Sequence, residues 1–289
     1  MTSHPIDHLV FPTRDLETAR ARLGALGFTV APKGTHPFGT VNCCVYLRDN
    51  TFLEPLAIGD AAATAKAAET GNMFVSRDRA FRERNGDEGF SAVVLGTDDA
   101  DADHARYLAA GVSAGQRLDF SRPFVDAAGR QDIASFRLAF AATPDMADAF
   151  LFSCERVNAS KVDRTALEAH ANGVKGIREV IGVSDEAQDK LRLLAAIADT
   201  PPAEAGGHRL VLPNTNISLT DPAGFEGRFG LGVEPSRLRF AAVVFTASDL
   251  GALAGRLASA EVEHHFQARS LVVPPAPGQG AAFIFEEDR

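Results

Sequence analysis

Residues 6–27 read IDHLVFPTRDLETARARLGALG, and this stretch decides the fold because a strand, a helix start and a helix end follow one another in it. The apolar run at its beginning is typical of a half-buried strand. After Asp15, leucines and an alanine recur at helical spacing and define one apolar helix face. Asp15 is a favourable N-cap, because its carboxylate can accept orphan backbone N–H groups, and Gly27 is a typical helix stop.

Three later stretches repeat this order of strand, aspartate and amphipathic helix. They are FSAVVLGTDDADADHARYLAAG (90–111), IREVIGVSDEAQDKLRLLAAIAD (177–199) and RFAAVVFTASDLGALAGRLASA (239–260). Extended segments follow each helix, so the unit reads β-α-β-β-β four times, with the third unit one strand short. Residues 60–88 form an insertion of helical character. We therefore predict an α+β fold of four tandem βαβββ modules in two pairs.

The chain has 289 residues, which agrees with two domains of about 100–200 residues each. We expect an N-terminal module pair over residues 1–157 and a divergent C-terminal pair over residues 173–289. The polar segment 158–172 reads as the linker between them.

Composition narrows the classes of partner. Hydrophobic residues make up 45% of the chain and charged residues 23%, which is an ordinary globular profile. The net charge of -9 argues against nucleic acid as the main partner, because phosphate binding needs a basic face. No apolar run approaches the roughly 18 residues of a membrane span, and no signal peptide is visible at the N-terminus. Three cysteines, two of them adjacent, do not suggest a secreted disulfide framework, so we expect a cytoplasmic protein.

Tandem βαβββ modules resemble the vicinal oxygen chelate superfamily, and the first module resembles its glyoxalase-like domain. The resemblance rests on IDHLVF with the following Asp-Leu and helix, then LGF, GTHPFGTVN (34–42) and FLEPLAI (52–58). It continues more weakly in SRPFVDAAGR (121–130) and in HANGVKGIREVIGV (170–183). The resemblance implies the fold far more firmly than a reaction, since the superfamily includes enzymes of several classes and drug-sequestering proteins.

In that superfamily a divalent metal, when present, is held by side chains on the first and last strands of each module. His8 lies on the predicted first strand and Glu54 on the last strand of module one, so the resemblance implies that both are metal ligands. An imidazole and a carboxylate suit Zn, Fe, Mn, Ni or Co, and Glu54 is the expected catalytic residue. A hydrogen bond between His8 and Glu54 without metal is the structural alternative, because both groups need a partner when buried.

The ligand set is incomplete in the sequence. Counting from the aspartates places Ala92 and Phe152 at the positions that match His8 and Glu54 in module two. In the C-terminal pair the same counting gives Arg178 and Ala242, and Glu286 alone resembles a final-strand carboxylate. Two protein ligands hold a catalytic divalent ion poorly. Three residues that could complete the site, but that the sequence does not place, are His36, Glu155 and His170.

Other residues are candidates for substrate contact. His36 and Asn42 lie around a turn marked by a proline and a glycine, and turn chemistry is their alternative explanation. Arg122 could receive an anionic group through its guanidinium fork, or it could be structural. At least one of Cys43 and Cys44 is expected to face the interior as a small hydrophobic residue, and neither is expected to be a nucleophile, since no activating base is visible.

These observations lead to two hypotheses of function. The first is a glyoxalase-like enzyme that uses a divalent metal for lyase, isomerase or dioxygenase chemistry on a small oxygen-bearing organic substrate. The second is a metal-free protein that binds or sequesters a small molecule. In both cases the expected partner is a small molecule, without nucleic acid or membrane, and the C-terminal pair could cover the cleft or build a homodimer.

Overall fold

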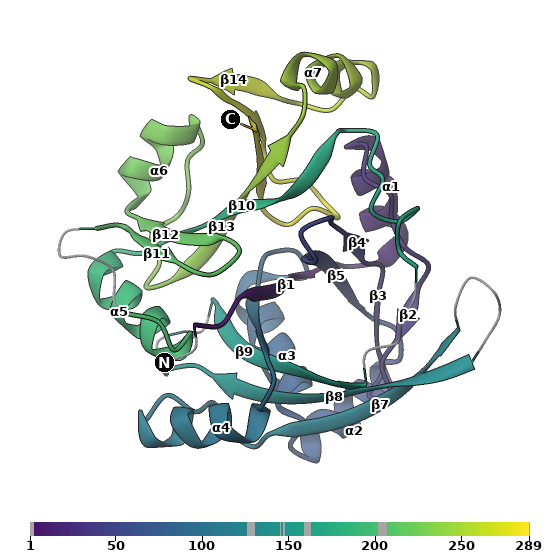
Figure 1. Ribbon diagram of the computed structural model, residues 1–289, viewed down its shortest axis with the longest axis vertical. Helices are drawn as coiled ribbons and strands as arrows, with labels where there is room; N and C mark the ends of the chain where they lie inside the picture. Colours follow the sequence, from purple (N-terminus) through teal and green to yellow (C-terminus); the bar gives the residue numbers. More distant parts are fainter. Residues whose placement is uncertain are drawn as a thin grey trace.

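The computed structural model follows the predicted order of modules (Figure 1). Each module begins with a strand, which is followed by a helix and then by further strands. The predicted α+β fold of βαβββ modules is confirmed. The residues that the structure describes are 3–125, 131–144, 146, 148–158, 163–201 and 207–288.

Modules one and two form one nine-stranded sheet. The strands and helices of these two modules are β1 (Ile6–Pro12), α1 (Leu16–Ala25), β2 (Gly34–Thr35), β3 (Thr40–Asn42), β4 (Val45–Tyr46), β5 (Phe52–Ile58), β6 (Ala92–Thr97), α4 (Ala100–Ala109), β7 (Leu118–Val125), β8 (Gln131–Ala141) and β9 (Phe150–Asn158). The strand order is β2-β3-β5-β1-β6-β9-β8-β7, and β4 pairs with β5. The antiparallel pair β1–β6 joins the two modules and sets His8 opposite Val94. The edges β2 and β7 come together where Arg122 lies beside Gly34, so the sheet is nearly closed and surrounds an interior.

Modules three and four form a seven-stranded sheet with the order β11-β12-β10-β13-β16-β15-β14. The strands and helices of these two modules are β10 (Val174–Val183), α5 (Ala187–Ile197), β11 (Arg209–Val211), β12 (Asn216–Thr220), α6 (Pro222–Phe229), β13 (Arg239–Ala247), α7 (Leu250–Ser259), β14 (His265–Gln267), β15 (Ser270–Val273) and β16 (Ala282–Glu287). Module three has only β11 and β12 after its helix in the described residues, which agrees with the missing strand noted in the sequence. The antiparallel pair β10–β13 joins these modules as β1–β6 joins the first two.

Helix starts follow the predicted aspartates in most modules. Asp15 and Asp249 accept hydrogen bonds from the backbone N–H groups of Thr18 and Ala252, three residues later. In module three the N-cap residue is Glu186 and not Asp185, and its side chain makes no capping hydrogen bond to α5. The insertion between modules one and two contains the helices α2 (Ala61–Glu69) and α3 (Met73–Asn85).

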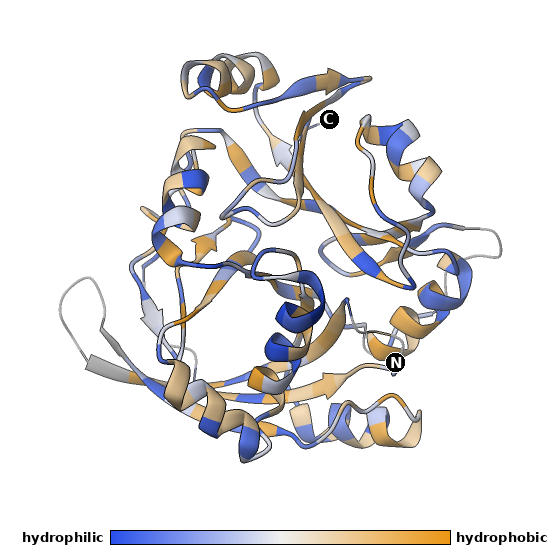
Figure 2. Cartoon of the chain, turned by 180° about the vertical axis from the view of Figure 1, so that it is seen from behind, coloured by the Kyte–Doolittle hydropathy of each residue, from blue (hydrophilic) through white to orange (hydrophobic). Residues whose placement is uncertain are grey.

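Aromatic side chains fill the space between the two sheets. Phe28 packs against Phe245, Phe283 and Phe285, with ring centroids 5.5, 6.1 and 6.4 Å away. Phe11 reaches Phe283 at 6.0 Å, so both halves of the chain contribute to one core. In Figure 2 hydrophobic residues follow the strands, while the outer helices mix hydrophilic and hydrophobic residues.

The predicted linker is only partly described, because residues 159–162 lie outside the described ranges. The rest of it contacts module one through several side chains, among them Arg164, which lies over the ring of Tyr46. His170 contacts the backbone N–H of Thr29 and the carbonyl of Tyr46, and Asn172 donates to the carbonyl of Leu26. No helix among the described residues has the length and apolar character needed to span a membrane.

Candidate functional site

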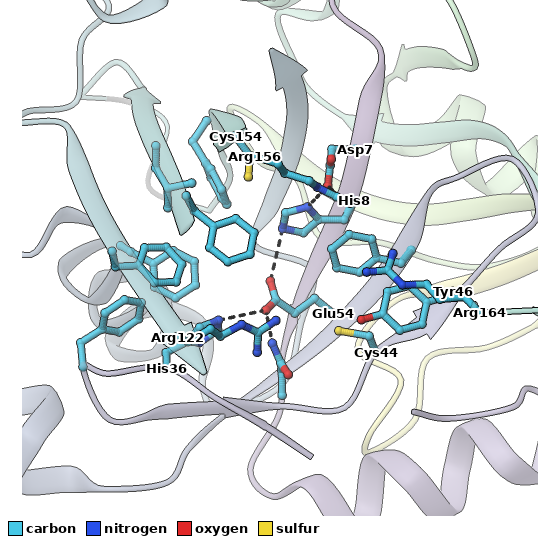
Figure 3. Close-up of a pocket in the computed structure, with 18 residues that line it drawn as sticks. Asp7, His8, His36, Cys44, Tyr46, Glu54, Arg122, Cys154, Arg156 and Arg164 are labelled. Atoms are coloured by element: carbon cyan, nitrogen blue, oxygen red, sulfur yellow. Dashed lines mark hydrogen bonds and ion pairs between the residues drawn. The ribbon is translucent and has the colours of Figure 1, made fainter. Parts of the chain in front are cut away.

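The interior of the N-terminal sheet holds a cavity lined by both polar and aromatic side chains (Figure 3). All five residues predicted to act in the site line it: His8, His36, Asn42, Glu54 and Arg122. Six of the other thirteen lining residues are phenylalanines. The other lining residues are Asp7, Phe38, Cys44, Tyr46, Phe52, Phe74, Phe120, Phe136, Leu138, Phe152, Cys154, Arg156 and Arg164.

A local irregularity in β1 directs two neighbouring side chains into this cavity. Regular alternation predicts that Asp7 and His8 face opposite sides of the strand. The pairing of β1 with β6 shifts register between Ile6 and His8, so one residue is extra on this strand, as in a β-bulge. Asp7 therefore joins His8 in the cavity, which corrects the expectation that strict alternation separates them.

Glu54 lies where several polar groups converge. Its Oε1 accepts a hydrogen bond of 2.6 Å from the Asn42 side-chain amide, and its Oε2 lies 3.3 Å from Nε2 of His8. Nε2 of His36 lies 3.7 Å from Oε1. Burial alone would raise the pKa of Glu54, but the contacts with the histidines and Asn42 outweigh it and lower the pKa to about 2. The buried carboxylate is therefore ionised at neutral pH.

His8 is held between two carboxylates. Its Nδ1 is 2.7 Å from Oδ1 of Asp7, and its ring stacks on Phe52 with centroids 4.3 Å apart. Burial opposes protonation, but the contacts with Asp7 and Glu54 outweigh it and raise the pKa of His8. Because both ring nitrogens lie near carboxylate oxygens, the doubly protonated imidazolium is the form that satisfies both contacts.

His36 has the opposite character. Its Nδ1 pairs with Oγ1 of Thr40 at 2.9 Å, and its ring stacks on Phe38. Burial lowers its pKa to about 4, against the weaker opposing charge of Glu54. The site therefore combines a protonated histidine with a neutral one, both beside the same carboxylate.

The sequence did not indicate Arg156, although a pattern in β9 points to it. Phe152, Cys154 and Arg156 alternate along the strand, and all three line the cavity. Arg156 donates a hydrogen bond of 2.7 Å to Asp7, so it fixes the carboxylate that holds His8. Burial works against ionisation of Asp7, but His8 and Arg156 lower its pKa.

The cysteines match the expectation of buried, unreactive thiols. Cys43 and Cys44 are buried, although they lie between β3 and β4 and not within a strand. Burial and the nearby Glu54 raise the pKa of Cys44, and burial raises the pKa of Cys43 to about 11. Both thiols are protonated at neutral pH and are poor nucleophiles.

The other suggested ligands lie elsewhere. Glu155 accepts a hydrogen bond from the backbone N–H of Ala100, and His170 binds backbone groups of module one. In the C-terminal pair, Arg178 donates a hydrogen bond of 3.0 Å to Glu286. These two residues occupy positions that match metal-ligand positions of the family, but they form an ion pair with each other. Of the three residues proposed to complete the ligand set, only His36 reaches Glu54.

The donors present do not fit a complete divalent-metal site. The candidate ligands His8, His36 and Glu54 all come from module one. Module two presents Phe152 at the position that matches Glu54. Both oxygens of Glu54 and both ring nitrogens of His8 already have protein partners. Within the described ranges, no cluster of three or more His, Cys, Asp or Glu side chains is arranged to hold a metal ion.

Comparison with solved structures identifies the fold. A hypothetical protein from Staphylococcus aureus is similar over 98% of this chain and 99% of its own, with 15% identity and a TM-score of 0.67. A mutant 4-hydroxymandelate synthase from Streptomyces coelicolor matches 99% of this chain and 93% of its own, with 12% identity and a TM-score of 0.59. A Mn(II)-bound glyoxalase from Novosphingobium aromaticivorans matches 99% of this chain and 82% of its own, with 12% identity and a TM-score of 0.52.

Sequence comparison assigns the family. No curated protein sequence matches the chain significantly. The family model of the glyoxalase-like domain matches residues 6–198, which include the whole of the cavity-bearing sheet. The chain therefore belongs to the glyoxalase-like domain family.

Proposed function

We propose that the protein is an enzyme that moves protons on a small oxygen-bearing organic substrate bound in the N-terminal cavity. The observation that carries this proposal is the buried pair of His8 and Glu54, which places a proton donor 3.3 Å from an ionised carboxylate at the cavity wall. A pair of titratable groups whose environments set opposite protonation states is the usual arrangement for acid and base catalysis.

In this mechanism Glu54 acts as base and His8 as acid. The Glu54 carboxylate takes a proton from a carbon next to a substrate carbonyl, and the electron pair moves to the carbonyl oxygen. The His8 imidazolium donates its Nε2 proton to that oxygen, which gives a neutral enol. Where the deprotonated carbon carries a hydroxyl group, this enol is an enediol. Its hydroxyl proton returns to Nε2 of His8 while Glu54 gives its proton to the former carbonyl carbon, which yields an isomer and restores both side chains, so atoms and charges balance without a further reactant.

The neighbouring polar residues have supporting roles in this proposal. Asn42 holds Oε1 of Glu54, so the other oxygen is the one directed to His8. His36 is a neutral contact for substrate oxygen, and Arg122 contributes a cation to the same corner of the cavity. The phenylalanine walls exclude water, which strengthens the electrostatic interactions inside.

The family resemblance predicts metal assistance, but the donors in the cavity do not fit a complete divalent-metal site. The mechanism above therefore rests on side chains of this chain alone. If a divalent ion were bound at His8 and Glu54, it would supply electrophilic stabilisation of the substrate oxygen.

The test is exchange of carbon-bound hydrogen for solvent deuterium. A panel of small aldehydes, ketones, hydroxy acids and oxo acids is incubated with the protein in D₂O and followed by proton NMR. We expect at least one compound to exchange with the wild-type protein and not with Glu54→Gln. Glu83→Gln is the control, because Glu83 is an exposed carboxylate 62% accessible on α3. If Glu54→Gln exchanged the same compound at the wild-type rate, the proposal would be wrong.

A metal-free binding protein is the second candidate, and the aromatic walls favour it. Phe120 and Phe136 stack with centroids 5.0 Å apart, and Phe38 meets Phe120 at 5.3 Å. Such a surface would hold a flat apolar molecule without chemistry. This candidate predicts ligand-dependent thermal stabilisation in the presence of a chelator, with no deuterium exchange in any compound of the panel.

A further inference from the structure

The charge inside the cavity is opposite to that of the whole chain. The chain carries a net charge of -9, yet three guanidinium groups and two carboxylates line the cavity. A local excess of positive charge in an apolar enclosure favours an anionic ligand more strongly than the net charge of the protein disfavours one.

The three arginines differ in what they contact. Arg156 donates to Asp7, and Arg164 stacks over the ring of Tyr46 at 4.2 Å. Arg122 lies 5.8 Å from the ring centroid of Phe136, and no carboxylate pairs with it anywhere in the described part of the chain. A half-buried guanidinium without a carboxylate partner retains its hydrogen-bond donors for an anion.

Gly34 leaves the space in which this guanidinium lies. A Cβ atom built on Gly34 would lie 2.6 Å from Nη1 of Arg122 and closer still to Oδ1 of Asn42. Real Cβ contacts are not this short, so any side chain at position 34 would displace both groups. Gly34 does not have a positive φ, so its absent side chain serves this close approach and not an unusual backbone conformation.

We infer that this site takes a small organic anion with a flat apolar body, and that Gly34 is a positioning residue that lets Arg122 reach the anion. The inference deepens the proposed function, because it concerns the substrate class of the same cavity. The anionic group would contact Arg122 beside Asn42, while the body would lie among Phe120, Phe136 and their neighbours. This arrangement directs the rest of the ligand toward Glu54, which Asn42 contacts.

The first experiment compares benzoate with benzamide by isothermal titration at pH 7. The two probes have nearly the same shape and differ in charge. We expect benzoate to bind at least about tenfold more tightly, since a hydrogen bond to a charged group is roughly twice as strong as a neutral one. In Arg122→Gln the preference should fall to about twofold or less. Equal affinity of the wild-type protein for both probes, or no binding of either, would overturn the inference.

The second experiment tests the role of Gly34. Gly34→Ala should weaken benzoate binding about tenfold and leave benzamide binding within about twofold. Gly24→Ala is the matched control, because nothing lies within 4 Å of a Cβ built there, and it should bind both probes like the wild type. Circular dichroism and thermal unfolding of each variant show whether the fold is retained. A folded Gly34→Ala variant with wild-type benzoate affinity would contradict the positioning role.

The outcomes separate this inference from the proposed function. Glu54→Gln should retain the preference for benzoate, because the preference depends on Arg122 and Gly34. Charge preference without Glu54-dependent deuterium exchange would contradict only the proton-transfer function. Glu54-dependent exchange without charge preference would contradict only the substrate class.

Discussion

Nε2 of His8 lies 3.3 Å from Oε2 of Glu54, while Nδ1 of the same ring lies 2.7 Å from Oδ1 of Asp7. The imidazole thus bridges two carboxylates from different strands, the half-buried Asp7 and the buried Glu54, and Arg156 pairs with Asp7. A carboxylate on Nδ1 fixes the ring orientation and keeps the proton of Nε2 directed at Glu54. The arrangement is asymmetric: Asp7 is paired with Arg156, whereas among the described residues no arginine pairs with Glu54.

Removal of the Asp7 carboxylate should lower the pKa of His8. In Asp7→Asn the ring loses one of the two negative charges that raise its pKa, while burial still opposes protonation. We expect the pKa of His8 to decrease, and NMR titration of the His8 ring protons measures the change. Asp189→Asn, an exposed change on α5, is the control. An unchanged titration of His8 in Asp7→Asn would show that Asp7 does not stabilise the imidazolium.

The stability of the protein should depend on Glu54 in acid. Its pKa is lowered from 4.5 to about 2 in the folded state, so between these values the unfolded chain binds the proton and the folded chain does not. Stability therefore falls as pH decreases through this window, and the full contribution, present above pH 4.5, is roughly 3 kcal/mol. The difference in unfolding free energy between wild type and Glu54→Gln should shrink from pH 5 to pH 2.5. Denaturant unfolding at both values measures it, and a constant difference would contradict the prediction.

The sequence was sufficient for the module order and for the two strands that carry the main pair. His8 and Glu54 were placed by period-two alternation and by the resemblance, and both line one cavity. Period-two alternation could also have identified Arg156, which follows Phe152 and Cys154 on the same face of β9.

The remaining parts of the site depend on geometry that single-sequence patterns do not encode. The register shift that turns Asp7 inward depends on the pairing of β1 with β6, a strand about 85 residues later. The approach of Arg122 to Gly34 depends on the closure of the sheet between β7 and β2. Both are relations between distant strands, and local propensity carries no signal for them.

The aromatic core between the sheets should make the two halves of the chain depend on each other. Phe283 is 1% exposed and contacts Phe245 at 5.1 Å, as well as rings of module one. Phe283→Ala should lower the free energy of unfolding by about 3–5 kcal/mol, because it leaves a cavity at the junction. Phe266→Ala is the control: this ring is 57% exposed on β14, so the change should cost less than about 0.5 kcal/mol. Equal losses in the two variants, measured by denaturant unfolding, would contradict the bridging role.

Chelation should leave the protein largely unchanged, because the polar atoms of His8 and Glu54 are already paired within the chain. We expect the thermal midpoint after treatment with EDTA to stay within about 1 °C of the untreated value, since loss of a tightly bound ion would remove several kcal/mol of stabilisation. Elemental analysis before and after treatment gives the metal content directly. His8→Ala separates the alternatives: if the untreated wild type holds one divalent ion per chain and His8→Ala holds none, the metal-assisted hypothesis is right. The catalytic role of His8 would then be to hold the ion and not to donate a proton.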